Sequence, residues 1–207
     1  MIPVHDLLIF AAASLLLVLT PGPNMIYLIS RSICQGRKAG VTSLIGVVAG
    51  FFVHLFAAAA GLTAVFLAVP MAYEVLKWAG ALYLLWMAWQ AVKPGARSPF
   101  EAQQLPPDSS RKLMLMGFFT SALNPKIAVF YLSVFPQFID PAQPYPLQFA
   151  TLVLTYSTLV IVIHCGYALF ARRAKGWLQS ERGGRLLGKI SAGSFVYFGA
   201  SLATAQR

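Results

Sequence analysis

The chain has 207 residues, of which 58% are hydrophobic and only 11% are charged. A soluble domain carries roughly 25% charged residues and about 45–50% apolar ones, so too few polar residues remain here to cover a water-exposed core. The composition excludes a soluble globular domain and leaves room for six membrane spans of about 20–25 residues. The net charge of +10 does not indicate nucleic-acid binding, because the basic residues lie in short clusters between apolar runs.

Six apolar runs follow one another along the chain. The first has no Lys or Arg before it and continues beyond Pro23, so we interpret it as a span and not as a cleaved signal peptide. The predicted spans cover residues 7–30, a stretch within 39–69, 72–92, 113–139, 147–171 and 187–205. A Pro-rich linker, 94–110, divides a single transmembrane domain, 1–207, into repeat one (1–93) and repeat two (111–207).

Lys and Arg residues gather in alternate loops between the predicted spans. Basic residues near span ends are retained on the cytoplasmic side of a membrane. Loops two and four contain neither residue type. The first, third and fifth loops contain Arg31, Arg37, Lys38, Lys93, Arg97, Arg111, Lys112, Arg172, Arg173, Lys175, Arg182, Arg185 and Lys189. We therefore expect both termini to face outward, and we interpret the positive charge as an orientation signal.

The two halves of the chain share one organisation. Each contains three predicted spans, and prolines interrupt the first span of each half at 21–23 and at 125. The third spans align small and aromatic residues over 77–83 and 189–195. An odd number of spans makes the two halves inverted across the membrane. The pattern predicts an all-α integral membrane protein of six transmembrane helices, built as two inverted three-helix repeats with broken first helices. That arrangement is typical of transporters with the substrate site at the breaks.

The first break contains Pro21, Gly22, Pro23 and Asn24. Proline removes a backbone donor and opens the helix, and the freed carbonyl groups must then face protein or a watery cavity. Asn24 is a favourable N-cap, and the half-helix after it would present N–H groups and a positive dipole end to a carboxylate. Tyr27 follows on the same helix face. These residues are candidate substrate ligands, and a purely structural kink is the alternative.

The second break contains Asn124, Pro125 and Lys126. Lys126 is the only Lys, Arg, Asp or Glu residue near the centre of a predicted span, where a charge costs at least about 2.5–3.5 kcal/mol. It would bind the substrate carboxylate or hold the two breaks together through exposed carbonyl groups, with snorkelling to the interface as the alternative. Tyr131 lies seven residues after Asn124 and shares its face. All four are candidate substrate-binding residues.

Three residues are candidates for proton coupling. His54 and His164 lie in the second span of each half, and imidazole titrates near neutral pH. The alternative is a neutral, hydrogen-bonded histidine. Glu74 lies at the end of the third span, where an ion pair on the helix surface is the competing interpretation. Gly46 and Gly50 precede His54 on one stripe, which predicts a close approach to a neighbouring helix.

These motifs resemble the lysine exporter (LysE/RhtB) superfamily, in particular its homoserine/threonine exporter branch. The resemblance covers nearly the whole chain and is based on residues 20–24, 37–40, 76–86, 124–126 and 135–138. It implies export of amino acids or their derivatives across the bacterial inner membrane, coupled to protons and carried out by a homodimer. Some similar proteins have an acidic residue in the fifth span, whereas 147–171 contains none here. His54, His164 or Glu74 would have to replace it.

We therefore predict an alternating-access exporter whose partners are an amino-acid substrate, protons and membrane lipid, without a cofactor or metal. One alternative is a metal or inorganic-ion exporter on the same scaffold, which would place Cys, His or Asp ligands at the breaks, where the sequence has none. Another is a non-transporting membrane accessory protein, which has no use for two matched breaks. An enzyme is not expected, because no nucleophile–base set is present. Cys34 and Cys165 form no CxxC pattern and are interpreted as small apolar side chains.

Overall fold

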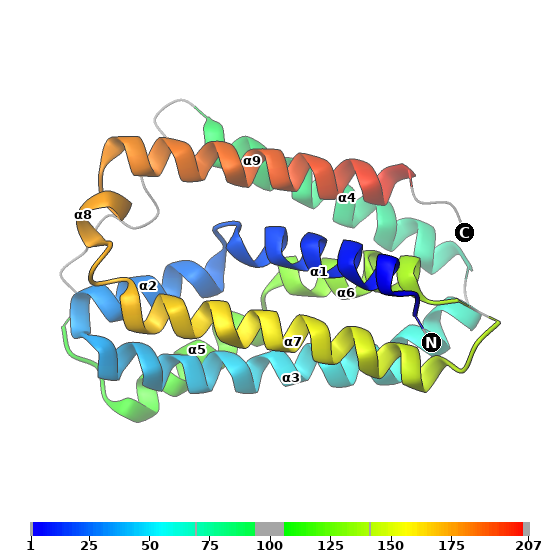
Figure 1. Cartoon of the computed structure of the whole chain (residues 1–207), viewed down its shortest axis with the longest axis horizontal. Coiled ribbons are helices and arrows are strands. Elements are labelled where there is room, and N and C mark those ends of the chain that lie inside the picture. The colour runs from blue at the N-terminus through cyan, green and yellow to red at the C-terminus, as the bar shows by residue number, and fades with distance from the viewer. Residues whose placement is uncertain (1, 69, 94–105, 141, 205–207) are drawn as a thin grey trace.

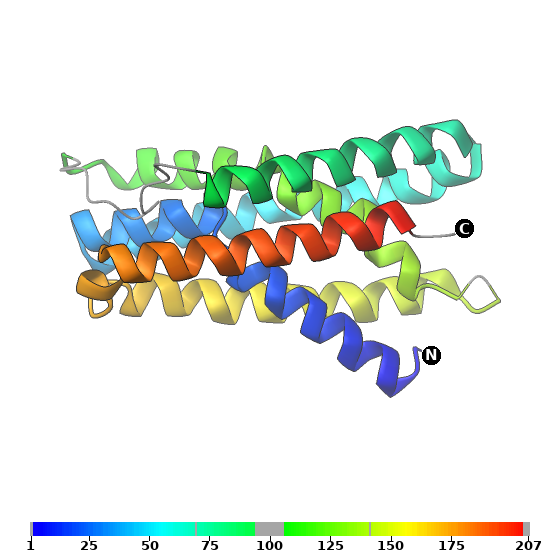
Figure 2. The same ribbon diagram turned by 90° about the horizontal axis from the view of Figure 1, so that it is seen from above.

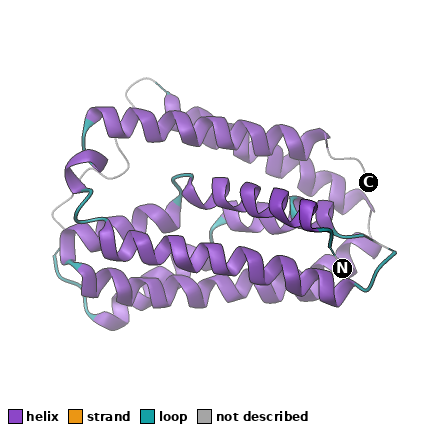
Figure 3. Ribbon diagram, viewed as in Figure 1, coloured by secondary structure: helices purple, strands orange, loops and turns teal. Residues whose placement is uncertain are grey.

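The computed structural model describes residues 2–68, 70–93, 106–140 and 142–204. Every regular element in these ranges is helical (Figures 1 and 3), as the sequence predicts. The elements are α1 (Val4–Leu19), α2 (Pro23–Gln35), α3 (Arg37–Ala68), α4 (Pro70–Val92), α5 (Ser110–Ala122), α6 (Pro125–Ser133), the 3₁₀ helix η1 (Phe135–Phe138), α7 (Tyr145–Phe170), α8 (Lys175–Leu178) and α9 (Glu181–Thr204). Most of the predicted linker falls on residues 94–105, outside the described residues.

The long helices form one elongated bundle (Figures 1 and 2). Helices α4 and α9 pack along each other, and so do α3 and α5. In the view of Figure 1, α1 and α6 lie between α4 and α9 on one side and α3 and α7 on the other, and Figure 2 shows the start of α1 at the outer edge of the bundle. The start of α1, the start of α7 and the end of α9 lie at one end of the bundle, and α8 lies at the other.

Both predicted helix breaks are present. Helices α1 and α2 meet at an angle of 51°, and α5 meets the segment Pro125–Phe138 at 44°. Pro23 and Pro125 are each the first residue of the helix after the break, a position where proline lacks only an N–H that would have no partner in the helix. A proline at the start of the second half-helix therefore marks each break, as the sequence predicts.

The described helices include several that are long and apolar enough to cross a bilayer. Two single helical stretches, Arg37–Ala59 of α3 and Tyr145–Phe170, meet this criterion. Each bent pair also meets it if its two helices form one span, which gives up to four membrane spans among the described residues. The other two predicted spans coincide with α4 and α9, which are 23 and 24 residues long. Their crossing of the membrane, and hence the six-span inverted repeat, stays a prediction.

Close packing between α3 and α5 confirms the role predicted for the glycine stripe. A Cβ atom on Gly46 would overlap the backbone carbonyl of Met114, and one on Gly50 would overlap that of Phe118. Gly117 of α5 has the same relation to the carbonyl of Ser43. Lipid tails are as apolar as the helices, so close van der Waals contact replaces the hydrophobic effect as the force that joins them. Small residues at this contact hold α5 against α3.

Aromatic side chains fill the centre of the bundle. Phe10, Phe130, Phe135 and Tyr131 are almost fully buried, and their rings contact one another at centroid distances of 4.4 to 6.0 Å. Edge-to-face pairs of this kind add to simple packing. The cluster surrounds α6 and fixes the second break relative to α1.

Candidate functional site

The first break brings together two helix ends of opposite polarity. Helix α1 ends at Leu19. Thr20 has an extended backbone, so the chain turns away from the helix axis at the C-terminal end of α1, where the last carbonyl groups of the helix lie. Helix α2 begins at Pro23, so the prediction of Asn24 as the N-cap residue is wrong: the chain turns into the helix one residue before Pro23. The N-cap residue is Gly22, which has no side chain to cap the first turn. The first turn of a helix leaves N–H groups without an acceptor inside the helix, and here these include Asn24 and Met25. The break therefore places a negative C-terminal end beside a positive N-terminal end.

The helix after the second break, α6, is capped by the side chain of Asn124. Asn124 Oδ1 accepts a hydrogen bond from the backbone N–H of Lys126 at 3.1 Å. The backbone carbonyl of Asn124 also accepts from the N–H groups of Ile127 and Ala128. Most of the donors at the start of α6 thus have partners within the break. The start of α2 is the better place for an anion.

Three buried polar side chains join the two breaks. Asn124 Nδ2 donates to Asn24 Oδ1, and Asn24 Nδ2 donates to Ser121 Oγ, both at 3.3 Å. Asn24 and Asn124 are 6% and 2% exposed, respectively. A buried amide needs such partners because its desolvation is otherwise uncompensated. These bonds cross from the first half of the chain to the second.

The side chain of Lys126 ends at the first break. Its Nζ donates to the carbonyl oxygen of Leu17 at 3.0 Å and to that of Thr20 at 2.8 Å. Lys126 is 7% exposed, so the side chain does not reach the surface of the bundle. Of the interpretations of Lys126 given above, contact with the freed carbonyl groups is the one that the geometry favours. The C-terminal dipole end of α1 stabilises the ammonium there.

A small cavity of about 20 Å³ lies between the two breaks. This is room for about one water molecule. Its polar lining comes from Asn24, Asn124, Lys126 and His164. The apolar lining, which the sequence did not single out, comes from Val18, Met25, Phe51, Ile127, Tyr156 and Val160, with Gly22 and its bare backbone also at the wall. The structure thus brings Gly22, Asn24, Asn124 and Lys126 together as predicted.

The two predicted tyrosines lie outside this cavity. Tyr27 is one turn further along α2, where its hydroxyl donates to the carbonyl of Leu113 at 2.6 Å and accepts from Ser43 Oγ at 3.2 Å. Tyr131 is 1% exposed and its ring packs 4.4 Å from that of Phe135. Its hydroxyl has no hydrogen-bond partner among the described residues. Their roles in substrate binding stay predictions.

The proton-coupling candidates are in different settings. His164 is buried, lines the cavity, and donates from Nδ1 to the carbonyl of Val160 at 2.8 Å. His54 Nε2 lies 2.8 Å from the carbonyl of Ser121, directly before the second break, and outside the cavity lining. Glu74 belongs to α4, and its side chain lies outside the described residues. Of the two whose side chains the structure describes, His164 is the one at the site.

A buried ion-pair cluster joins α2 to the start of α5, and the sequence analysis did not find it. Asp108 contacts Arg31 at 2.5 Å and Lys112 at 2.6 Å, and it accepts from Gln35 Nε2 at 3.0 Å. The side chains of Arg31 and Asp108 are only 9% and 7% exposed. Hydrogen bonds from Lys112 and Gln35 and the charge of Arg31 lower the pKa of Asp108. A lone acid after a Pro-rich run was the only available signal.

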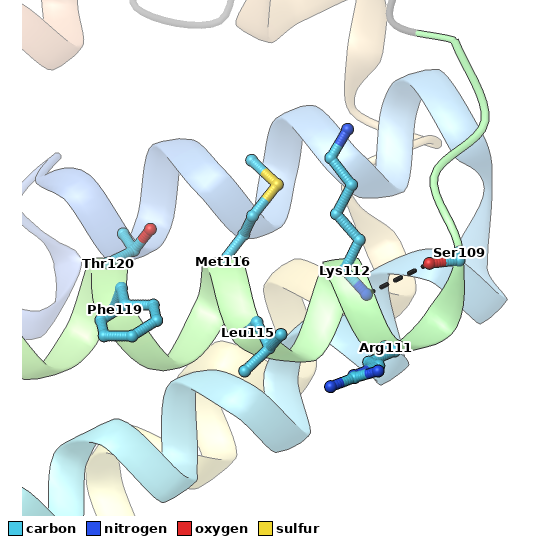
Figure 4. Close-up of a pocket in the computed structure, with 7 residues that line it drawn as sticks. All are labelled: Ser109, Arg111, Lys112, Leu115, Met116, Phe119 and Thr120. Carbon is cyan, nitrogen blue, oxygen red and sulfur yellow. Dashed lines mark hydrogen bonds between the residues drawn. The ribbon is translucent and has the colours of Figure 1, made fainter.

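Two larger hollows lie at the surface. One, of about 460 Å³, follows the outer face of α5 from Ser109 to Thr120 (Figure 4), and a helix face of this kind suits lipid or a neighbouring helix. The other, of about 510 Å³, is lined by Gln35, Lys38, Asp108 and Arg172 among others. Neither contains a residue of the breaks. Among the described residues, no three His, Cys, Asp or Glu side chains form a group that could hold a metal ion.

Comparison with known proteins identifies the family. The family model of the LysE type translocator matches residues 15–206. The chain belongs to the LysE family. It is 34% identical to a homoserine/homoserine lactone efflux protein of Salmonella typhimurium over 95% of both chains. It is 27% identical to a leucine efflux protein of Klebsiella pneumoniae, over 98% of this chain and 97% of the other. It is also 28% identical to an uncharacterized membrane protein of Vibrio cholerae over 98% of both.

Membership of this family establishes the general class of the protein. It is a multi-pass membrane protein and a translocator, not an enzyme. No solved structure matches the chain.

Proposed function

We propose that this translocator exports amino acids or their derivatives, of the homoserine/threonine type, across the bacterial inner membrane in exchange for protons. The names of its relatives, homoserine/homoserine lactone efflux protein and leucine efflux protein, support an amino-acid substrate. The match to these relatives extends over nearly the full length of each chain. The names of the relatives give a substrate class, and the two helix breaks are where we place the substrate-binding site.

The observation that carries the proposal is the pair of helix ends at the first break. An α-amino acid is a zwitterion with an ammonium and a carboxylate on one carbon. The carbonyl groups of Leu17 and Thr20 already hold an ammonium, that of Lys126. The uncapped start of α2, with the amide of Asn24, offers donors to a carboxylate. One break thus supplies ligands for both charges of the substrate, and Lys126 and Asn124 complete the polar wall.

Homoserine and its lactone differ in the group that a site for the substrate carboxylate would bind. The lactone is a cyclic ester without a free carboxylate, whereas both compounds retain the α-ammonium. A site for both must therefore depend mainly on the ammonium, with the start of α2 bonding to a carboxylate or an ester oxygen. The hydroxyl of Tyr131, together with the apolar wall from Phe51 and Val160, would then receive the side chain.

The small size of the site supports transport by alternating access. A cavity of about 20 Å³ does not hold a free amino acid, so α2 and α6 must move apart to admit one. One end of the bundle carries α8, the α2–α3 turn and the start of α5, and is called the basic end here. The bonds of Tyr27 to Leu113 and of Arg31 to Asp108 separate the cavity from the hollow of about 510 Å³ at this end. We propose that six spans in two inverted repeats, with both termini outside, open this barrier and its counterpart in turn. Each protomer of a homodimer would contain one such site.

Efflux from intact cells tests this function. Cells that overproduce the protein are loaded with labelled homoserine, homoserine lactone, threonine or leucine, and release is followed with and without a proton uncoupler. We expect selective efflux that stops with the uncoupler, and loss of that efflux in Lys126→Ala at an equal amount of protein in the membrane. Absence of efflux of every compound from correctly inserted protein would contradict the proposal, and normal efflux from Lys126→Ala would contradict the site.

A further inference from the structure

Lys126 is a buried cation whose side chain, in the part of the chain that the structure describes, bonds to backbone carbonyl groups. Its Nζ donates to the carbonyl groups of Leu17 and Thr20, and the side chains that line the cavity beside it include no carboxylate among the described residues. A buried ammonium that loses its partners is strongly destabilised and gives up its proton. The charge of Lys126 therefore depends on these two carbonyl groups.

The site has no space for a second ammonium at the same carbonyl groups. The cavity holds about 20 Å³, and a Cβ atom on Gly22 would lie only 2.9 Å from Nζ of Lys126. Two cations that share these acceptors would also repel each other strongly in a dry environment. A substrate ammonium can bind to Leu17 and Thr20 only after that of Lys126 has left or lost its charge.

On the basis of the function proposed above, we propose that the substrate's α-ammonium displaces Lys126 from the carbonyl groups of Leu17 and Thr20, and that Lys126 releases one proton as it leaves. The step breaks one N–H bond of the Lys126 ammonium and leaves a neutral amine, while the proton bonds to a neighbouring acceptor and passes from there to solvent. One positive charge enters the site as another departs. Lys126 is then both the occupant of the empty carrier and the group that couples substrate to protons.

The groups around Lys126 allow this proton to leave. The titratable side chains that line the cavity with it are His164 and Tyr156, both from α7. Helices α2 and α3 contribute Asn24 and Phe51, and Asn124 directly precedes α6. His164 Nδ1 donates to the carbonyl of Val160, so in the neutral imidazole Nε2 is the acceptor. In the proposed step His164 Nε2, which belongs to the same cavity lining, relays the proton. This arrangement needs no carboxylate in α7.

Calorimetry of the purified full-length protein in lipid nanodiscs tests the inference. Homoserine is titrated in buffers of different ionisation enthalpy, which gives the number of protons released on binding. We expect the wild type and the control Lys189→Met, an exposed lysine in α9, to release about one proton per substrate. We expect Lys126→Met to release none and to bind homoserine several-fold more tightly, because the competing ammonium is gone. 4-Hydroxybutyrate, which lacks the ammonium, should bind to neither.

Three results would overturn the inference. They are binding to the wild type without proton release, proton release that persists in Lys126→Met, and binding to Lys126→Met that is weaker by about tenfold or more, as expected for a lost substrate contact of about 1.4 kcal/mol. If Lys126→Met does not fold, the wild-type proton count alone decides. Failure of amino-acid efflux in cells contradicts the proposed function, whereas efflux without proton release on binding contradicts the role of Lys126 alone.

Discussion

Gly22 determines how closely Lys126 approaches the first break. A Cβ atom at this position would lie 2.9 Å from Nζ and 3.2 Å from Cε of Lys126. Gly22→Ala must therefore push the ammonium from the carbonyl groups of Leu17 and Thr20. We expect the variant to lose about 1–3 kcal/mol of stability, because the displaced ammonium gives up its hydrogen bonds to buried carbonyl groups, and to export substrate more slowly. Thermal melting in detergent and efflux at matched expression measure the two effects.

Gly166 is a suitable control for that substitution. It lies inside α7, and a Cβ atom there would have nothing within 4 Å. We expect Gly166→Ala to melt at the same temperature or slightly higher, since alanine stabilises a helix interior by about 0.5–1 kcal/mol over glycine. Equal melting temperatures for Gly22→Ala and Gly166→Ala would show that Lys126 adjusts without cost, and would contradict the tight packing described above.

At the scale of the element, α2 is bonded along one face to the second half of the chain. Asn24, Tyr27, Arg31 and Gln35 follow one another on that face, and each bonds to a residue between 106 and 124. The contacts run from the cavity to the basic end of the bundle. Asp108 is the acid in this series, and it fixes the end of α2 through Arg31 and Gln35. Opening of the basic end requires these bonds to break.

The lowered pKa of Asp108 gives this cluster a defined pH dependence. Hydrogen bonds from Lys112 and Gln35 hold that pKa below the ordinary value of about 4. The stabilisation by the carboxylate is therefore complete above pH 4 and is lost as the pH falls through the lowered pKa. We expect Asp108→Asn to melt below the wild type at pH 7, and the difference in melting temperature to shrink as the pH falls below 4 and the carboxylate becomes protonated. Melting curves across this range provide the measurement.

The matched control is Glu181, which pairs with Arg185 on the exposed surface of α9. An exposed pair contributes little to stability, so Glu181→Gln should melt with the wild type at each pH. If the difference in melting temperature between the wild type and Asp108→Asn stays constant from pH 7 to pH 3, the carboxylate charge is not the stabilising feature.

The helix elements were predictable because their signals are local. Pro23 and Pro125 end one helix and begin the next through their own geometry, and Gly46 and Gly50 permit a close helix contact wherever one occurs. The lining of the cavity was not predictable. Phe51 and Val160 lie in runs that are apolar on every side, so the sequence pattern does not distinguish a lipid-facing side chain from a buried one.

Contacts between distant residues were also beyond the sequence. Arg31 and Asp108 are 77 positions apart, and Lys126 is 109 positions from Leu17. The charge pattern identified Arg31 only as a residue of the first basic loop. The sequence indicated that Lys126 requires a partner, but only the packing of α6 against α1 determines which carbonyl groups it reaches.

For the whole molecule, the positions of the loops support one orientation in the membrane. The α2–α3 turn, the start of α5 and α8 lie at one end of the bundle, and the starts of α1 and α7 lie at the other (Figures 1 and 2). The predicted cytoplasmic loops, which hold most of the Lys and Arg residues, therefore share one end. Retention of basic residues in the cytoplasm then predicts that the α7 start is external and α8 is internal.

Cysteine labelling in intact cells tests this orientation. In a background with Cys34 and Cys165 replaced by serine, a single cysteine is placed at Ala142, before α7, or at Gly176, in α8. Both positions are exposed, and a Cβ at Gly176 meets nothing within 4 Å, so neither substitution should disturb the fold. We expect a membrane-impermeant maleimide to label Ala142→Cys in intact cells and Gly176→Cys only after permeabilisation. The opposite pattern would invert the molecule, and labelling of both in intact cells would place the two ends of α7 on one side, which a helix that spans the bilayer does not allow.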